Sequence, residues 1–100
     1  MTLLPVLSVA SLKPGDKVRF EQPFPATDEF RLASSPEHII SPGTEGEVLA
    51  VHAEYEHAVV LVCHPTEGPL TTLVHDIASK RTRDLRNRTD AIVKISQETT

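Results

Sequence analysis

Alternation of polar and apolar residues is the clearest pattern along this chain. The segment from Lys17 to Phe20 alternates with a period of two, which is typical of a strand with one buried face. Two runs rich in β-branched residues follow, from Glu47 to Ala53 and from His57 to Cys63. Further apolar runs extend from Leu70 to Ile77 and from Ala91 to Ile95. Because no segment has the spacing of an amphipathic helix, the pattern predicts an all-β protein with five strands.

Turn residues separate these predicted strands. The segments from Leu12 to Asp16 and from Pro42 to Gly46 carry the proline and glycine of tight turns. The four residues from Ala53 to Glu56 suit a short hairpin loop, which would place His52 directly opposite His57. We expect the core to include six apolar residues of the predicted strands: Val18, Phe20, Val48, Val60, Val62 and Val74.

A long proline-rich excursion separates the first two predicted strands. It extends from Glu21 to Gly43 and contains four prolines, which exclude a long helix and a central strand. Connections of this length hold structure of their own or a function. The sequence suggests a small hairpin between Phe30–Leu32 and His38–Ile40. Phe24, which lies between two prolines, and Phe30 either contact a partner or cap the end of the barrel.

The layout of short strands, one long excursion and tight hairpins resembles an SH3-like small barrel. The resemblance is carried by Pro14 to Phe20 and by Pro42 to Val48. The second segment is similar to the Gly-x-x-Gly-x-Val turn of KOW-type modules in ribosomal and transcription-elongation proteins. Both segments are also similar to small barrel subunits of larger oxidoreductase assemblies in photosynthetic membranes. The resemblance implies a five-stranded antiparallel SH3-like small barrel with a long excursion loop after the first strand.

The size and composition of the chain fit one small domain. Its 100 residues are 39% hydrophobic, enough for one core but too few for a cavity that encloses a cofactor, so we expect none. We expect an N-terminal apolar segment over residues 1–11 that packs on the barrel, the barrel itself over 12–95, and a frayed tail over 96–100. A single cysteine, Cys63, cannot form an intrachain disulfide, and the opening run lacks the basic start of a signal peptide. These features predict a soluble, cytoplasmic protein without a membrane span.

Charge is distributed unevenly along the chain. The net charge is −4, yet the segment from Lys80 to Arg88 carries five positive charges and one negative charge, so the other residues sum to −8. We call residues 80–88 the basic connector. Its positive charges ring a helical wheel and do not alternate as on a strand, which indicates a solvated segment. An acidic remainder repels polyanions, so the distribution favours an acidic protein partner over nucleic acid.

Histidines are the main candidates for metal chemistry. His52 and His57, flanked by Glu54 and Glu56, form the best pair. Two ligands on neighbouring strands do not make a site, and the chain lacks Cys–His motif spacing, so we expect no physiological metal. Acid should charge both imidazoles and weaken the hairpin through repulsion.

The residue types of catalytic sites occur without the required spacing. Cys63 and His64 are adjacent, so on a strand they face opposite sides, and Cys63 is expected to be a small core residue. His75, Asp76 and Ser79 supply the residue types of a hydrolase triad, but no Gly-x-Ser-x-Gly elbow accompanies them. The sequence therefore predicts a protein that is not an enzyme.

Three functions remain open from the sequence. The first is a small protein-binding or adaptor module whose contact residues lie in the excursion and the basic connector: Phe24, Phe30, Arg81, Arg83 and Arg86. The second is a KOW-type nucleic-acid-binding module that uses the positive residues of the connector: Lys80, Arg81, Arg83, Arg86 and Arg88. The third, implied by the resemblance, is an accessory barrel subunit of a larger oxidoreductase assembly.

Overall fold

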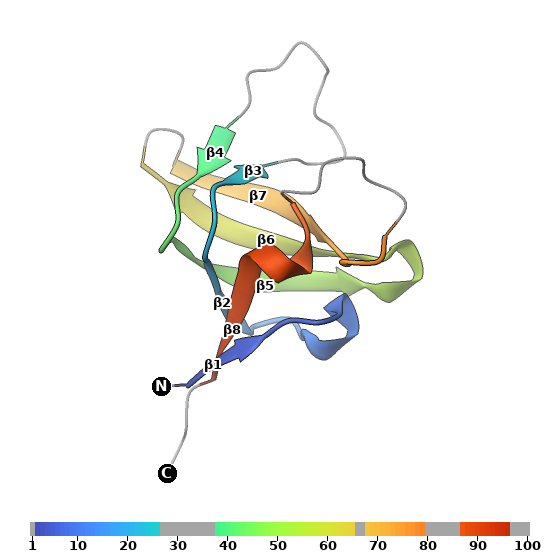
Figure 1. Cartoon of the computed structure of the whole chain (residues 1–100). Coiled ribbons are helices and arrows are strands. Elements are labelled where there is room, and N and C mark those ends of the chain that lie inside the picture. The colour runs from blue at the N-terminus through green and yellow to red at the C-terminus, as the bar shows by residue number, and fades with distance from the viewer. Residues whose placement is uncertain (1, 27–37, 66–67, 80–86, 97–100) are drawn as a thin grey trace.

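Strands and short 3-10 helices make up the regular structure of this protein (Figure 1). The computed structural model describes residues 2–26, 38–65, 68–79 and 87–96. In chain order the elements are β1 (Thr2–Pro5), η1 (Val9–Ser11), β2 (Lys17–Phe20), β3 (Phe24–Ala26), β4 (His38–Ile40), β5 (Glu45–His52), η2 (Ala53–Tyr55), β6 (His57–His64), β7 (Gly68–His75), η3 (Thr89–Ala91) and β8 (Ile92–Ser96). No α-helix occurs in these ranges, so the prediction of an all-β protein is confirmed.

Six strands form one antiparallel sheet in the order β1-β8-β2-β5-β6-β7. The five predicted strands correspond to β2, β5, β6, β7 and β8, with ends shifted by a few residues. β8 returns from the end of the chain to pair with β2, where Phe20 lies opposite Ile92. In Figure 1, β5, β6 and β7 cross behind β2 and β8, so the sheet curls around its core. β1 and β7, at the two ends of the strand order, do not pair with each other, so the described sheet is not a closed barrel.

The N-terminal segment contributes both an edge strand and part of the core. β1 pairs with β8 from Thr2 opposite Ser96 to Pro5 opposite Val93, which makes it a sixth strand that the alternation pattern did not predict. After β1 the chain buries three apolar side chains in the main core: Val6, Val9 and Leu12.

The excursion after β2 contains a separate two-stranded ribbon, β3 with β4, in which Phe24 lies opposite Ile40. Both side chains belong to the main core, so the ribbon packs on the sheet. His38–Ile40 forms a strand, as the predicted hairpin required, and it pairs with β3. Residues 30–32, the other half of the predicted hairpin, lie outside the described residues.

The core fills one side of the sheet. All six residues predicted for it are buried, with at most 2% of each side chain exposed. Gly46 of β5 lies on the same side, where a Cβ atom would stand 2.8 Å from Val60 Cγ1 and 2.9 Å from the Leu61 carbonyl oxygen. Glycine is therefore required for the close approach of β5 and β6 at this point.

The side of β5, β6 and β7 that faces away from the core is called the outer face here. Strand register places its side chains in rows across the three strands: Glu47 with Leu61 and Thr71, Ala50 with Val59 and Leu73, and His52 with His57 and His75. Between these rows lie the core-facing positions of the same strands, which are buried except for the partly buried Val51.

Candidate functional site

The described ends of the basic connector are anchored at the end of β7. On the N-terminal side, the Ser79 amide donates to the Asp76 carbonyl oxygen at 2.9 Å. On the C-terminal side, the Asn87 carbonyl oxygen accepts from the His75 amide at 3.0 Å, and Arg88 forms a parallel bridge with His75. Ser79 and Asn87 are both buried. The segment between them therefore starts and ends beside the last residues of β7.

Arg88 takes part in this anchor. Its Nη1 donates to the Ile77 carbonyl oxygen at 2.6 Å, which ties the two ends of the connector together. The other predicted nucleic-acid or protein contacts of the connector lie outside the described residues: Lys80, Arg81, Arg83 and Arg86. Of the five positive residues in the connector, Arg88 is thus the one for which a structural contact is seen.

Three histidines form a row across the end of the outer face, and we call His52, His57 and His75 the histidine row. The predicted pairing of His52 with His57 is confirmed, with ring centroids 5.4 Å apart. His75 lies opposite His57 on β7, with ring centroids 5.9 Å apart. Tyr55 stacks on His57 at 6.1 Å. The sequence did not predict that His75 joins the row, because its position depends on the register between β6 and β7.

Burial changes the chemistry of His75. The residue is 8% exposed, and its Nδ1 atom makes no hydrogen bond. Loss of water around the ring lowers the pKa of His75 below its ordinary value, and the positive charges of protonated His57 and of Arg88 lower it further. The neutral form of this imidazole is therefore favoured in the folded protein.

The polar residues near the histidine row make structural contacts. Across residues 2–26, 38–65, 68–79 and 87–96, no three His, Cys, Asp or Glu side chains are arranged to hold a metal ion. Glu54 Oε1 lies 3.8 Å from Nδ1 of His52. Asp76, considered above as part of a triad, accepts a hydrogen bond from Ser8 Oγ at 3.2 Å through Oδ2. This contact ties the N-terminal segment to the end of β7.

Two phenylalanines were predicted as protein contacts, Phe24 and Phe30. Phe24 is 0% exposed and packs edge-on against Phe20, with ring centroids 4.8 Å apart. Its proposed role as a surface contact is corrected: the ring belongs to the core, as the capping alternative described. Phe30 lies outside the described residues.

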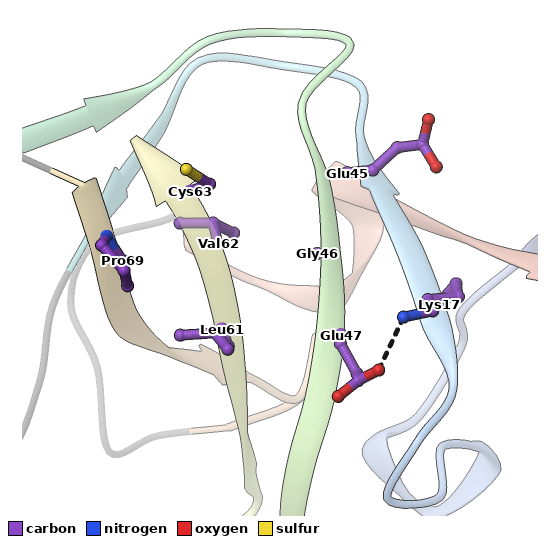
Figure 2. Close-up of a pocket in the computed structure, with 8 residues that line it drawn as sticks. All are labelled: Lys17, Glu45, Gly46, Glu47, Leu61, Val62, Cys63 and Pro69. Atoms are coloured by element: carbon purple, nitrogen blue, oxygen red, sulfur yellow. Dashed lines mark hydrogen bonds and ion pairs between the residues drawn. The ribbon is translucent and has the colours of Figure 1, made fainter. Parts of the chain in front are cut away.

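A shallow hollow of about 390 Å³ lies at the opposite end of the outer face from the histidine row. Figure 2 shows β7, β6, β5 and β2 side by side at this hollow. Its lining comes from all four strands: Lys17, Glu45, Gly46, Glu47, Leu61, Val62, Cys63 and Pro69. Lys17 Nζ pairs with Glu47 Oε1 at 2.6 Å. Cys63 is exposed, so its predicted place in the core was wrong: β6 buries Val62 and turns the next side chain outward.

No protein-family model matches this sequence, and neither a curated protein nor a solved structure matches it. In the described part of the chain, no helix has the length and hydrophobicity needed to cross a membrane.

Proposed function

We propose that this protein is a small non-enzymatic binding module of the SH3-like barrel type. The strand order supports this: in the five strands predicted from the sequence, the first pairs with both the second and the last, and the second, third and fourth form a meander. A last strand that returns to the first is what a half-open small barrel requires. Binding, rather than catalysis, agrees with the structural contacts made by Asp76 and Ser79.

The proposed contact surface is the basic connector, and the observation that carries it is the anchoring of both connector ends beside β7. The Arg88 contact to Ile77 and the backbone bond between His75 and Asn87 hold the two ends in one place. The connector that these ends belong to carries five positive charges within nine residues of sequence. Positive charges that lie close together give a stronger local potential than the same charges spread over the surface.

The proposed partner is an acidic protein surface. The rest of the chain carries a net charge of −8, which opposes the approach of a long phosphate backbone across the whole domain. A protein partner can instead present a few carboxylates to the connector alone. Arginine suits this role because its guanidinium pairs with a carboxylate through two parallel hydrogen bonds.

The proposal is tested by replacing Arg81, Arg83 and Arg86 together with Ser. We expect thermal stability to change little, because surface ion pairs typically contribute between 0 and about 1 kcal/mol. Capture of a protein from a lysate of the native host should be lost at low ionic strength, where the contribution of the charges is greatest. A variant with Lys at the same three positions keeps the charge and serves as the matched control.

Nuclease treatment of a parallel sample separates the two binding functions. Capture that resists nuclease, disappears in the Ser variant and persists in the Lys variant supports a protein partner. Capture that nuclease abolishes assigns the connector to nucleic acid instead. Capture that is equal for the wild type and the Ser variant contradicts the proposal, because the connector would then be a plain link between strands.

A further inference from the structure

The histidine row continues past β7 into the C-terminal end of the basic connector. His52, His57 and His75 lie side by side on β5, β6 and β7. Arg88 forms a bridge with His75 on the other side of β7. Basic side chains therefore follow one another across four segments of the chain. Because imidazoles gain a proton in mild acid and a guanidinium is always charged, acid adds positive charge beside the permanent charge of Arg88.

His75 lies between two of these basic groups. The His57 ring is on β6, with its centroid 5.9 Å from that of His75, and Arg88 is on the connector side. Burial lowers the pKa of His75, and the positive charges of His57 and Arg88 lower it further. A proton on the His75 ring is therefore opposed by its surroundings on both sides.

The acidic residues near the row do not offset this opposition. Glu54 Oε1 lies 3.8 Å from His52 Nδ1, at the far end of the row. The Asp76 carboxylate accepts a hydrogen bond from the N-terminal segment, and the Glu56 backbone carbonyl accepts one from the Asp76 amide at 2.8 Å. None of these carboxylates raises the pKa of His75. Protonation of this ring thus adds a buried charge without a counter-charge.

The pairing of the connector end with β7 is much shorter than the pairing of β6 with β7. β6 pairs with β7 along all eight of its residues, whereas the connector end meets β7 in one isolated bridge. Two buried polar atoms at or next to this bridge, His75 Nδ1 and Thr89 Oγ1, make no hydrogen bond. Such atoms destabilise the packing around them, and local opening begins where packing is weakest. A charged His75 ring therefore displaces the connector end rather than β6.

We propose that mild acid releases Asn87 and Arg88 from the end of β7 while the six-stranded sheet stays folded. The His75 amide then loses its bond to the Asn87 carbonyl oxygen, and Arg88 leaves the Ile77 carbonyl oxygen. The release ends at Thr89, which begins η3 and is followed directly by β8. It does not depend on the partner that the connector binds, so it holds or fails separately from the proposed function.

The direction of the pH effect follows from the two states of His75. While the connector end is attached, the pKa of His75 lies below the ordinary 6.5. In the released state the ring is exposed to water and its pKa returns towards that ordinary value. Protons are then bound more readily in the released state, so the released fraction rises as the pH falls below 6.5. The rise ends at the lowered pKa of the attached state.

Amide hydrogen exchange of the full chain, measured by NMR at about pH 7 and about pH 5.5 and corrected for the intrinsic pH dependence of exchange, tests the release. Uptake of one proton changes an equilibrium constant by up to about tenfold per pH unit. We expect the protection of the His75 amide to fall about threefold or more in acid, relative to the Val48 amide in the sheet. The Val48 amide donates to the Asp16 carbonyl oxygen at 2.8 Å. The Asp76 amide, bonded on the β6 side, should keep its protection.

Histidine variants identify the group that responds to acid. His75→Gln should remove the acid response at the amide of position 75. His57→Gln removes a facing charge and should weaken the response, which keeps the test valid if the first variant does not fold. His38→Gln, on β4 and outside the row, is the matched control and should respond as the wild type does.

Three results overturn the proposal. The first is a protection of the His75 amide, relative to Val48, that is the same at both pH values. The second is a loss of protection shared by His75 and Asp76, since the end of β7 then separates from β6 instead. The third is an acid response that persists unchanged in the folded His75→Gln variant, since another group then drives it.

Discussion

At the scale of single residues, His75 shows how a position in the sheet sets the chemistry of a side chain. It closes the histidine row on β7, and its imidazole is almost entirely removed from water. Burial is the main reason for its lowered pKa, followed by the positive charges of His57 and Arg88. A proton is therefore bound less readily in the folded protein than in the unfolded chain.

This difference predicts a loss of stability in mild acid. The pKa of His75 is lower in the folded state than the ordinary 6.5, so the neutral imidazole makes its full contribution to the free energy of unfolding above pH 6.5. This contribution is lost as the pH falls from 6.5 through the lowered pKa of the folded state. In urea unfolding from neutral pH to about pH 5, His75→Gln should show a weaker loss of stability with acid than the wild type. His38→Gln, on β4 and outside the histidine row, serves as the matched control for replacing a histidine. Equal pH dependence for His75→Gln and the wild type would contradict this prediction.

At the scale of elements, the ribbon formed by β3 and β4 joins the excursion to the core. Phe24 and Ile40, paired across the ribbon, are both fully buried, whereas Ile39 on the same strand is 38% exposed. β4 therefore alternates between a buried and an exposed side chain, whereas all three residues of β3 are buried. Among the described residues β3 pairs on one side only, and proline is tolerated in such edge strands.

We expect Phe24→Ala to cost about 3–5 kcal/mol of unfolding free energy, the usual effect of removing a buried phenylalanine ring. Ile39→Ala should change stability by roughly 0.5 kcal/mol or less, because the side chain is on the exposed face of the same ribbon. Urea unfolding of both variants gives the comparison. Similar small effects for the two variants would refute the assignment of Phe24 to the core.

At the scale of the whole molecule, the last strand joins the two ends of the chain. β8 lies between β1 and β2, so it pairs with the first residues of the protein and with the first predicted strand. Ile92 and Ile95 of β8 are 2% and 6% exposed. The Ser8 contact to Asp76 adds a second link between distant parts of the sequence. The fold therefore depends on pairing between segments that are far apart in the sequence.

Removal of residues 92–100 should leave a chain that does not fold, since β1 and β2 would both lose their shared neighbour. The matched control ends at Ser96, the last residue of β8, and keeps every described strand pairing. Far-ultraviolet circular dichroism and the dispersion of proton NMR signals distinguish folded from unfolded chains. A cooperative unfolding transition in the shorter chain would show that β8 is dispensable.

Local sequence patterns predicted several features of the fold and of the candidate site. The Lys17–Phe20 strand follows from its alternation, and the pairing of His52 with His57 follows from the length of the loop between them. The run from Ala58 to Cys63 was harder to interpret because it is apolar throughout, so no polar position marks the outward side. The acid repulsion expected between His52 and His57 stays a prediction.

The sequence by itself determined five of the six strands of the main sheet, the turns between them and six residues of the core. These depend on the alternation of side chains and on proline and glycine at turns, which act over a few residues. Tertiary structure alone decided that β4 pairs with β3, that β1 joins β8, that His75 completes the histidine row and that Cys63 faces outward. Each of these depends on which strands meet and in what register, and that is set by burial of one shared core by segments far apart in the chain.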